Sequence, residues 1–548
     1  MNSLELSSMS DEKLNSLELD GKTFGVIGVC GIVGNLVARI LMDRGYKVIG
    51  TDMSSKENCR FDSSFEGYDI KIYYGGHPKA FFKEIDYVFV PQSLPKKAKV
   101  FDFIEEADIC ILELGDIFKL FKPDKKVICI SGTNGKTTTT QLLKKIAYSA
   151  GLKPCEHNLE GMQGNNEFIP SLQDRLNGDI AILETGTDGT PGGLKSVVDL
   201  THPNFAILTN ITPDHLVDPE NTDKHKGFLD YAKVKGELIQ GIEENEGTLI
   251  YNSDDPTVVG LLQELDYQGK SISFGLDYDN ESSSTKPCWC GREIEIDEVI
   301  YGCGVYDCEC GIRYEKPDYI ASNISLENRS FTLEGPDGVH DFKLAMDGLH
   351  NIYNAVGAII ASRIFLDLSD DEIQNGLSQF TGALGRMEIM GEVEGKTIMV
   401  DYAHNPAGVK SVLQAVDEIY DKVAVVITVT SESGEEGDIE ILKNAIGNVD
   451  YIIPASYDCR AAADKLLSIA SEGEGDYDLN LLSSIFVFTE GEMEQKGVRT
   501  LGASQEQVLN GLETALKTDA DLVLCLGEAA FKFDPAIKDF CKNQEKSS

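Results

Sequence analysis

Short apolar runs alternate with amphipathic segments along most of the chain, and this alternation predicts the fold class. Residues 22–29 (KTFGVIGV) and 47–50 are expected strands, with a helical pattern over residues 36–41 between them. Further apolar runs of strand length lie at residues 87–91, 109–113, 397–401, 423–430, 451–454 and 521–527, and a helix is expected to begin near Ala407. Buried strands separated by helices are typical of parallel sheets with helices on both faces. The pattern therefore predicts an α/β protein with doubly wound sheets at both ends of the chain.

Glycines follow the first expected strand at every third position. Gly28, Gly31 and Gly34 lie in the turn that leads into the helix, where glycine lets the backbone approach a phosphate and the helix N-terminus adds donors. Cys30 stands where the dinucleotide fingerprint G-x-G-x-x-G has a glycine. We favour ligand binding here over tight helix–strand packing without a ligand. Asp52, at the end of the second strand, is able either to accept from a ribose hydroxyl or to cap the following segment.

The strongest signal in the chain is a second glycine-rich turn. Residues 126–130 (KVICI) are an expected buried strand, and SGTNGKTTTT follows at residues 131–140. A strand, a glycine-rich loop and Lys-Thr at a helix start form the phosphate cradle of ATP-binding proteins. We expect Lys136 to bridge the β- and γ-phosphates and the Thr137 hydroxyl to bind Mg²⁺. The expected ATP-binding residues of the loop are Gly132, Thr133, Asn134, Gly135, Lys136, Thr137 and Thr138.

Two chemically active side chains follow later strands. Residues 179–184 (DIAILE) form an expected strand that ends in Glu184, and residues 206–210 (AILTN) form another, which is followed by ITPDH with His215. Side chains at the carboxyl ends of parallel strands lie at the ligand-binding edge of the sheet. Either residue alone would be interpreted as a helix cap or a loop histidine. Because both follow the phosphate loop in this order, they are candidates for the rest of an ATP site.

The cysteines form one dense group and several isolated positions. Isolated cysteines such as Cys110, Cys129 and Cys525 lie in apolar segments, and 13 is an odd total, so we expect reduced thiols rather than a disulfide framework. The dense group, which contains two C-x-C-G knuckles, consists of Cys288, Cys290, Cys303, Cys308 and Cys310. A structural zinc ion held by four of these five is favoured over a cluster of thiols or disulfides, and an iron–sulfur cluster is a further alternative.

Length and charge limit the possible functions. A chain of 548 residues is expected to form about three or four domains. It has 49 Lys and Arg against 91 Asp and Glu, a formal net charge of −42, which disfavours a nucleic-acid partner or an anionic membrane surface. No apolar run reaches the roughly 20 residues of a spanning helix, and the acidic residues 1–20 do not resemble a signal peptide. We therefore expect a cytoplasmic protein.

These motifs together resemble the Mur ligase family, the ATP-dependent ligases that build cell-wall peptides. The matching segments are GTNGKTTTT (132–140), the strand end at Glu184, TNITPDH (209–215), AKVKGELI (232–239), NSDDP (252–256), DGLHNIYNAVGA (347–358), GRME (385–388) and DYAHNPAG (401–408). The resemblance implies three domains. They are a Rossmann-like domain for the UDP end of the substrate (1–125), a central P-loop ATPase domain (126–389) with a cysteine-rich zinc insertion (285–318), and a C-terminal doubly wound α/β ligase domain (390–548).

The resemblance also implies a mechanism. ATP phosphorylates a substrate carboxylate to an acyl phosphate, the amine of an incoming amino acid attacks it, and an amide, ADP and phosphate result. Residues at the positions that hold Mg²⁺ in the family are Thr137, Glu184 and His215, together with Lys235, which matches a lysine that the family carbamylates. Lys233 is the competing candidate. Catalytic roles are implied for Lys136, Lys235, His215 and Arg386.

The same comparison assigns substrate contacts. Asn351 and Asn354 match positions that face adenine, Arg386 matches an arginine that reaches the phosphates, and Asp401 matches a residue that contacts ribose or phosphate. The loop with His404 and Asn405 matches the one that presents the amino acid. Gly28, Gly31, Gly34 and Asp52 would bind the UDP-linked peptide precursor, and we expect a monomer.

Several functions remain open at this point. The N-terminal domain together with the ligase motifs is similar to the archaeal pseudomurein peptide ligases, which makes a pseudomurein-type precursor the favoured substrate. The cysteine insertion resembles that of the lipid II amidating subunit, which works with a partner glutaminase. A folylpolyglutamate-type ligase would leave residues 1–125 without a role. A nucleotide-binding regulator without chemistry is disfavoured because Lys136, Glu184, His215 and Arg386 are all present.

Overall fold

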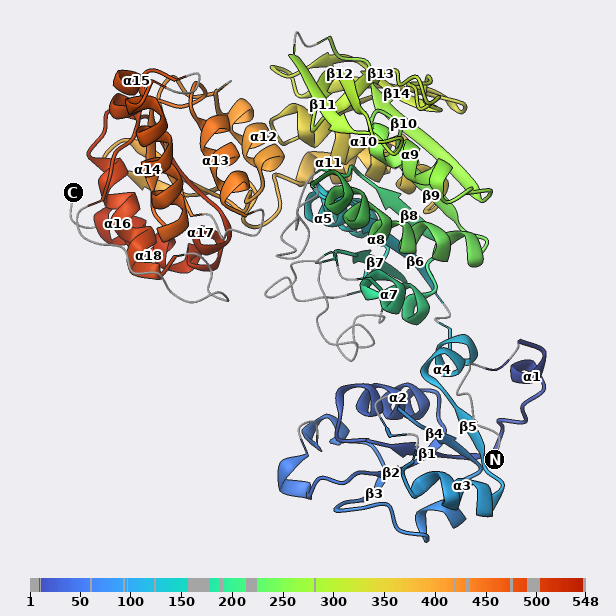
Figure 1. The fold of residues 1–548 in the computed structure, drawn as a ribbon. Coiled ribbons are helices and arrows are strands. Elements are labelled where there is room, and N and C mark those ends of the chain that lie inside the picture. Colours follow the sequence, from blue (N-terminus) through green and yellow to red (C-terminus); the bar gives the residue numbers. More distant parts are fainter. Residues whose placement is uncertain are drawn as a thin grey trace. The chain divides into compact units, whose positions relative to one another are not determined.

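The computed structural model describes most of the chain. The described residues are 9, 11–59, 62–91, 94–95, 97–122, 125–155, 178–187, 189, 191–212, 224–279, 282–417, 419–428, 434–473, 477–489 and 503–545. Two compact units are present (Figure 1). The first consists of Met1–Val127, Lys153–Ala181 and Gly193–Pro203, and the second of Ile128–Leu152, Ile182–Gly192 and Asn204–Ser548. None of the described helices combines the length and apolar composition that a membrane-spanning helix needs.

The first unit contains a parallel sheet of strand order β3-β2-β1-β4-β5. Its strands are β1 (Thr23–Ile27), β2 (Lys47–Thr51), β3 (Lys71–Tyr73), β4 (Tyr87–Phe89) and β5 (Cys110–Leu112). Its helices before residue 125 are α1 (Asp11–Asn15), α2 (Ile32–Asp43), α3 (Val100–Ala107) and α4 (Leu114–Leu120), with 3-10 turns at Lys56–Asn58, Asp62–Phe65 and Phe81–Lys83. The chain reverses direction across the sheet between β1 and β4, which is the switch point of a doubly wound fold. The expected strands and helix are confirmed here, and β3 was not anticipated.

One covalent cross-link departs from the sequence-based expectation. Cys30, in the turn after β1, forms a disulfide with Cys59. The expectation that the cysteines are all reduced is therefore wrong at this pair, while the other cysteines form no disulfide among the described residues. Composition cannot identify such a pair, because the two residues are 29 positions apart and only the fold brings them together.

The central sheet has the strand order β16-β15-β14-β10-β9-β8-β6-β7. Its strands are β6 (Lys126–Ser131), β7 (Ile180–Glu184), β8 (Phe205–Leu208), β9 (Thr248–Asn252), β10 (Lys270–Leu276), β14 (Tyr319–Ser325), β15 (Ser330–Gly335) and β16 (Gly338–Lys343). Strands β6, β8, β9, β10 and β14 run parallel, and β14, β15 and β16 form an antiparallel meander at one edge. The carboxyl ends of β6, β7 and β8 are thereby brought to adjacent positions.

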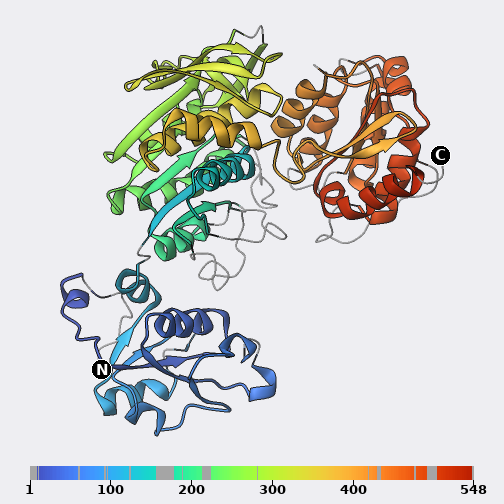
Figure 2. The same cartoon turned by 180° about the vertical axis from the view of Figure 1, so that it is seen from behind.

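Helices cover both faces of the central sheet. They are α5 (Lys136–Ser149), α8 (Lys224–Glu244), α9 (Pro256–Glu264), α10 (Leu349–Ile364) and α11 (Asp370–Gln379). Helix α7 (Gly193–Thr201) belongs to the first unit, where it packs against α4. Helices α5, α10 and α11 pack together, and α8 packs against α9. Helix α8 faces the viewer in Figure 1, and α10 faces the viewer when the molecule is turned (Figure 2).

The cysteine-rich segment forms a separate antiparallel sheet of order β11-β12-β13. The strands are β11 (Ser282–Pro287), β12 (Glu293–Ile300) and β13 (Cys303–Tyr306), and β11 packs against α8 and α9. Inward residues such as Ile294 and Ile296 are buried, and the alternate residues of β12 are exposed, as expected for a sheet with one covered face.

The C-terminal sheet has the order β17-β18-β21-β19-β20. Its strands are β17 (Glu388–Val393), β18 (Lys396–Asp401), β19 (Val423–Ile427), β20 (Tyr451–Pro454) and β21 (Leu522–Leu526). Only β17 is antiparallel to its neighbour. The helices are α12 (Pro406–Asp417), α13 (Gly434–Ala445), α14 (Tyr457–Ser471), α15 (Leu479–Ile485), α16 (Gln505–Leu516), α17 (Glu528–Lys532) and α18 (Asp534–Glu545).

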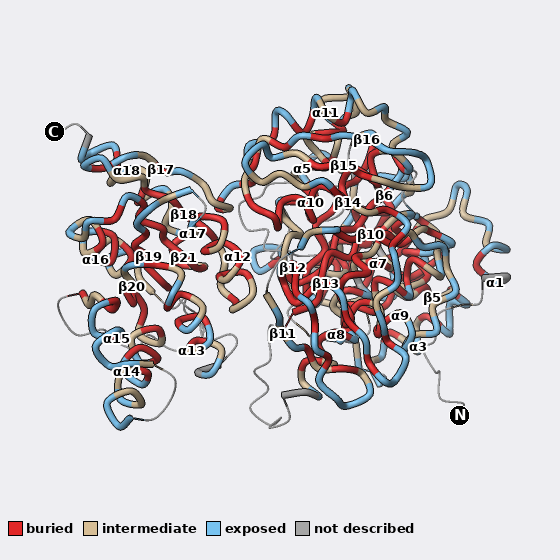
Figure 3. The backbone as a smooth tube through the Cα atoms, turned by 90° about the horizontal axis from the view of Figure 1, so that it is seen from above, coloured by how far each residue is buried: buried red, intermediate tan, exposed pale blue. Residues whose placement is uncertain are grey.

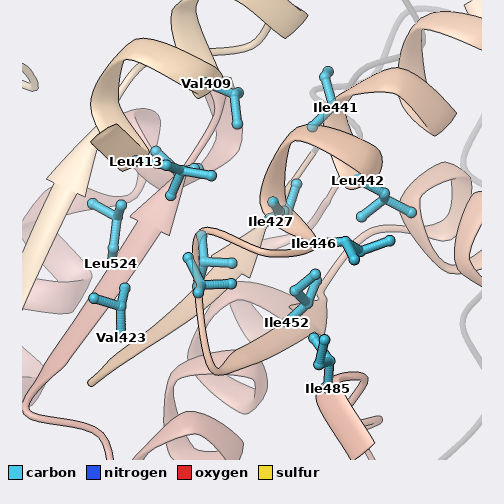
Figure 4. Packing of buried hydrophobic residues seen from close by; sticks show 14 of the residues in the cluster. Val409, Leu413, Val423, Ile427, Ile441, Leu442, Ile446, Ile452, Ile485 and Leu524 are labelled. Atoms are coloured by element: carbon cyan, nitrogen blue, oxygen red, sulfur yellow. The ribbon is translucent and has the colours of Figure 1, made fainter. Parts of the chain in front are cut away.

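Alternate residues of the C-terminal strands point into two separate hydrophobic cores, one on each face of the sheet. Val423, Val425 and Ile427 point into a core with α12, α13 and α14, while Ala424 and Val426 point into the core on the opposite face. Figure 4 shows the first core, in which Leu413, Ile441 and Leu442 meet the strands. Burying each such side chain contributes roughly 1.5–3 kcal/mol. Figure 3 draws the strands β18, β19 and β21 mostly in red, the colour of buried residues, as the near-continuous apolar runs predict for doubly covered sheets.

Candidate active site

The second glycine-rich turn, residues 132–135, links β6 to α5. Gly132 has φ of +140° and Gly135 has φ of +85°, in the region that favours glycine. A Cβ at Gly132 would lie 1.9 Å from Thr209 Oγ1, and one at Gly135 would lie 2.1 Å from Asn354 Oδ1. Both glycines are therefore required by the space as well as by the backbone. The N-terminus of α5 directly follows, so its free N–H groups are directed to the same place.

Polar residues after β8 hold this turn in shape. The Thr133 N–H donates to Asn210 O at 2.7 Å, and the Asn134 N–H donates to Asn210 Oδ1 at 3.1 Å. Thr209 Oγ1 donates to Asn134 O at 2.6 Å. Because the partners are neutral amides and hydroxyls, the turn keeps the positive partial charge of its N–H groups, which suits an anion.

Lysine, threonine and glutamate converge at the start of α5. The Lys136 Nζ donates to Thr133 O at 2.7 Å and so lies over the turn. Thr137 Oγ1 donates to Glu184 Oε1 at 3.0 Å. Burial raises the pKa of the Glu184 carboxyl, and the nearby charges of Lys136 and Arg386 oppose that rise. The sheet order explains the meeting, because Glu184 ends β7, the neighbour of β6.

The same cluster fits a divalent cation. Glu184 is 5% exposed, and its Oε2 is buried without a hydrogen-bond partner among the residues that the structure describes. A buried acceptor of this kind, beside a threonine hydroxyl at the end of a phosphate-binding turn, is a donor set of the type that Mg²⁺ prefers. His215, the other sequence-based candidate, lies outside the described residues, so its place in the cluster stays a prediction.

Two lysines of α8 lie in different environments. Lys235 is 1% exposed; its Nζ donates to Gly132 O at 2.9 Å and lies 4.7 Å from the centre of the Tyr231 ring. Lys233 is exposed, and its Nζ lies 5.9 Å from the centre of the Trp289 ring. Of these two lysines, only Lys235 is therefore directed to the second glycine-rich turn, whereas Lys233 faces the cysteine-rich sheet.

The two asparagines of α10 lie beneath the turn. Asn354 is 3% exposed, contacts the Gly135 position, and donates through Nδ2 to Asn351 Oδ1 at 3.2 Å. Asn351, 7% exposed, donates through Nδ2 to Asp347 O at 2.7 Å. This pair supports the floor of the site. Its predicted role next to an adenine ring stays a prediction.

Residues near the start of the C-terminal sheet reach the same site. Arg386 Nη2 lies 3.4 Å from Thr137 Oγ1, and its guanidinium stacks 4.6 Å from the centre of the Tyr402 ring. Asp401, which is 3% exposed, accepts from the N–H groups of Met387 and Ala403 and so fixes the residue after Arg386 and the residue after Tyr402. Burial raises the pKa of Asp401, and Arg386 opposes the rise.

The loop before α12 also contacts the turn. Asn405 Nδ2 donates to Asn134 Oδ1 at 3.3 Å, and Asn405 Oδ1 accepts from the Gly408 N–H. His404 lies against Tyr402, with ring centres 4.9 Å apart, and its Nδ1 is 3.2 Å from Tyr402 O. Thus Asn405 touches the phosphate-binding turn itself, while His404 lies beside the Arg386–Tyr402 pair.

The first glycine-rich turn is constructed differently. A Cβ at Gly34 would lie 2.1 Å from Gly28 O, so this glycine permits close packing of α2 on the turn. Gly28 has φ of +76°, and Gly31 donates to Gly28 O. Asp52 Oδ2 accepts from the Cys30 N–H at 2.9 Å, and its Oδ1 accepts from Ser54 N. Of the two roles that the sequence left open for Asp52, capping is the one that these contacts match.

Four cysteine sulfurs form a compact cluster. The Sγ atoms of Cys288, Cys290, Cys308 and Cys310 all lie within 4.8 Å of one another. Four of the Sγ–Sγ distances are 3.4–3.7 Å, compared with about 3.8 Å for a tetrahedron of sulfurs around zinc, given the usual Zn–S distance. Both knuckles have the same turn, in which a glycine N–H, from Gly291 or Gly311, donates to the first cysteine's carbonyl. Cys303 is buried elsewhere, near Asn252.

A buried ionic network next to the site was missed from the sequence. Lys286, 4% exposed, donates to Asp255 Oδ1 at 2.9 Å and to Ile211 O at 3.1 Å, and Asp255 Oδ2 accepts from Ile211 N. Tyr353 donates to Asp254, whose pKa is raised to about 7 by burial. The motif NSDDP gave the positions of the two aspartates, and a lysine at an inward position of β11 was the signal for the network.

Family comparison now adds an independent line of evidence. Residues 130–362 match the family model of the Mur ligase middle domain, and residues 385–529 match that of the Mur ligase glutamate ligase domain. A UDP-N-acetylmuramate–L-alanine ligase of Clostridium novyi is 27% identical over 505 residues, covering 89% of this chain and 96% of that protein. One of Clostridium acetobutylicum is 26% identical over 514 residues, covering 92% and 95%.

Solved structures include a pseudomurein peptide ligase type C from Methanothermus fervidus. It is 32% identical with a TM-score of 0.67, and the match covers 95% of this chain and 100% of that one. MurF from Acinetobacter baumannii shares the fold at 19% identity and a TM-score of 0.54, covering 83% and 90%.

Proposed function

Because the chain belongs to the Mur ligase family, whose members are ATP-dependent, ADP-forming amide ligases, we propose that it adds an amino acid to a UDP-linked cell-wall peptide of pseudomurein type. The observation that carries this proposal is the convergence of Lys136, Thr137, Glu184 and Arg386 at one turn. The choice of a pseudomurein-type precursor is supported by the 32% identity to the pseudomurein peptide ligase, over nearly the whole of both chains.

Each charge at the turn has a task in this reaction. An oxygen of the substrate carboxylate attacks the γ-phosphorus, the bond to the ADP oxygen breaks, and an acyl phosphate forms. The amine of the amino acid then attacks the acyl carbon, loses a proton and displaces phosphate. The first step brings anionic groups together, so Lys136 and Arg386 would neutralise the transferred phosphoryl group.

Thr137 and Glu184 would hold Mg²⁺, which when bound polarises the phosphoryl oxygens. The unpartnered Oε2 of Glu184 supports this assignment. Binding a cation would keep the Glu184 carboxylate ionised, against the effect of burial on its pKa.

Lys235 is the proposed carbamylated lysine. Its Nζ is buried next to the turn, whereas that of Lys233 is exposed. Carbamylation would replace the buried cation with an anion able to bind a second cation. Asn351, Asn354 and Asp401 are proposed to shape the nucleotide site, and His404 and Asn405 the site of the incoming amino acid.

The first glycine-rich turn, with Gly28, Gly31, Gly34 and Asp52, is proposed to lie at the UDP end of the substrate. Asp52 would act there by fixing the turn, in accord with its bond to the Cys30 N–H.

A structural zinc ion is proposed for Cys288, Cys290, Cys308 and Cys310. The donor set and the sulfur spacing fit Zn²⁺. Purified protein should contain about one zinc per chain. Cys288→Ser should lose the metal and shift the fluorescence of Trp289, the one tryptophan of the chain. The matched variant Cys303→Ser should keep the metal and the fluorescence of the parent protein. Equal metal content in the two variants would disprove the assignment.

Phosphate release is the decisive measurement for the ligase reaction. UDP-linked peptides should be tested as acceptors against all amino acids and ammonia, with ATP and Mg²⁺. We expect release only with one acceptor class and one or a few amino acids. Release that is independent of the acceptor would contradict the proposed function.

The cysteine cluster supports a second candidate, an ATP-dependent amidating subunit that receives ammonia from a partner glutaminase. Turnover with ammonia at a rate above that with every amino acid would favour this candidate.

A further inference from the structure

A carboxylate occupies an inward position of the cysteine-rich sheet. In β12, Ile294, Ile296 and Glu298 lie at alternate buried positions, and Glu298 is 4% exposed, while Glu293 and Glu295 face solvent. A buried carboxylate costs several kcal/mol unless it is paired and hydrogen-bonded. Its position therefore needs an explanation other than solubility.

The partners of Glu298 come from two directions. Its Oε1 accepts from the Gly302 N–H at 2.8 Å, within the same sheet, next to a register shift in the pairing of β12 with β13. Its Oε2 accepts from Lys410 Nζ at 2.7 Å. Lys410 belongs to α12, 112 residues further along the chain. Among the described residues, this ion pair joins the cysteine-rich sheet to the C-terminal sheet's first helix.

Buried side chains follow both partners of the ion pair in the sequence. Tyr301, at the β12–β13 turn, is 8% exposed, and burial raises the pKa of its hydroxyl. Ser411, the neighbour of Lys410 in α12, is 1% exposed. The ion pair therefore lies next to packed, buried positions in both elements.

The same helix contacts the phosphate-binding turn. Gly408 lies so close that a Cβ there would be 3.2 Å from Asn134 Oδ1, and Asn405, just before the helix, donates to that same oxygen. Ala415 contacts the Gly348 position at the start of α10. Residues 408, 411 and 415 follow the spacing of one helical face. This face of α12 thus contacts the turn at residues 132–135 and α10, while Lys410, beside it, reaches the cysteine-rich sheet.

We propose that Glu298 and Lys410 are positioning residues, and that their ion pair holds α12 against the phosphate-binding turn so that the nucleotide site is complete. The proposal rests on the function proposed above. It gives the cysteine-rich sheet a role in the ligase reaction, because this sheet supplies Glu298, the carboxylate that pairs with Lys410 of α12.

Nucleotide binding to the full-length, metal-loaded protein tests this proposal. Calorimetry with Mg²⁺ and the non-hydrolysable ATP analogue AMP-PNP needs neither the acceptor nor the amino acid. We expect Lys410→Met and Glu298→Gln to weaken binding about tenfold, and Lys410→Arg, which keeps the cation, to restore it to within about twofold. In turnover assays the KM for ATP should rise by a similar factor, with kcat changed less than threefold.

Two matched variants control for charge alone. Lys443→Met removes a lysine of α13 that pairs with Glu440 on its own helix, and Glu295→Gln removes an exposed glutamate of β12. Both should bind AMP-PNP like the parent protein. In small-angle scattering, Lys410→Met should increase the radius of gyration of the nucleotide-bound protein, and Lys410→Arg should not.

The outcomes separate the two proposals. Unchanged binding in Lys410→Met, or equal losses in Lys410→Met and Lys443→Met, would refute the positioning role. A Lys136→Ala protein that keeps full turnover would instead refute the proposed function, whatever Lys410→Met does.

Discussion

The two glycine-rich turns follow the same strand–turn–helix pattern but differ in the side chains that hydrogen-bond to them. After β1, the Asp52 carboxylate accepts from a turn N–H, and Gly34 permits close packing of the helix. After β6, neutral Asn210 and Thr209 hold the turn, and Lys136 lies over it. The first turn therefore has a negative charge next to its Cys30 N–H, whereas the N–H groups of Thr133 and Asn134 in the second turn donate to neutral acceptors and a cation lies over that turn.

This difference shows that glycine spacing alone does not identify a phosphate site. A glycine can be required by packing alone, as at position 34, or by packing and backbone conformation together, as at position 135. The charge of the side chain that hydrogen-bonds to the turn distinguishes the two cases: Asp52 is anionic, whereas Asn210 and Thr209 are neutral. Mutations at the two turns should accordingly affect different properties.

The largest effect is expected at the second turn. Lys136→Ala should lower ATP-dependent phosphate release at least about a thousandfold, since it removes a cation directed at the transferred phosphoryl group. Thermal unfolding should change little. Lys145→Ala, on the same helix, serves as the control and should retain activity. If Lys136→Ala keeps its turnover, Lys136 has no part in phosphoryl transfer, and the proposed functional difference between the two turns is wrong.

Glu184→Gln should lower turnover about a hundredfold and also change how stability depends on pH. Burial raises the pKa of Glu184 above its ordinary value of 4.5, so the folded protein holds that proton more tightly than the unfolded chain does. Its stabilising contribution is complete below pH 4.5 and is lost as pH rises through the folded pKa.

Urea unfolding of the parent and the Gln variant at several pH values would measure this. The difference in unfolding free energy should grow in favour of the variant as pH rises, and Mg²⁺ should reduce it. A difference that is constant with pH would show that burial does not control this carboxyl.

In the first turn the expected loss is one of stability. Gly34→Ala places a Cβ 2.1 Å from Gly28 O and should destabilise the first unit by roughly 1–3 kcal/mol. Gly31→Ala is the matched control, because its Cβ would lie 3.3 Å from the same oxygen and its φ is −88°. Faster amide hydrogen exchange in β1 and α2 would show that this part of the first unit unfolds more often. Equal protection in both variants would be evidence against the packing role of Gly34.

The smallest effect is expected from Asp52→Asn. Loss of one of its two accepted hydrogen bonds should cost about 1 kcal/mol. Asp43→Asn, which alters an exposed bond from Tyr68, should cost less. The free energy of unfolding, measured with denaturant, and the hydrogen exchange of residues 28–34 would be compared between the two variants. If Asp52→Asn costs no more than Asp43→Asn, Asp52 does not stabilise the turn.

The fold was predictable to the extent that its strands are continuous apolar runs. Strands such as β6, β18 and β20 were located to within a residue or two, because parallel strands buried on both faces show their burial directly in the sequence. The strand β3 has three residues, none of them fully buried, so no apolar pattern marks it. The strand β19 ends at Ile427, before the expected residue 430.

The candidate site was predictable where one motif supplies both backbone and chemistry. The turn at 132–137 is such a motif, and Glu184 follows from its place at a strand end. Lys286 and Glu298 were not anticipated, since each is a charged residue at an inward strand position whose partner, Asp255 or Lys410, comes from another part of the chain. Sequence distance hides such pairs.

The disulfide between Cys30 and Cys59 ties the ends of a 29-residue segment that contains α2 and β2. In an oxidising buffer the unfolded chain would retain this covalent ring, whose lost chain entropy corresponds to roughly 3–4 kcal/mol by the polymer argument. A reductant removes that constraint. The stability of the first unit during purification therefore depends on the redox composition of the buffer.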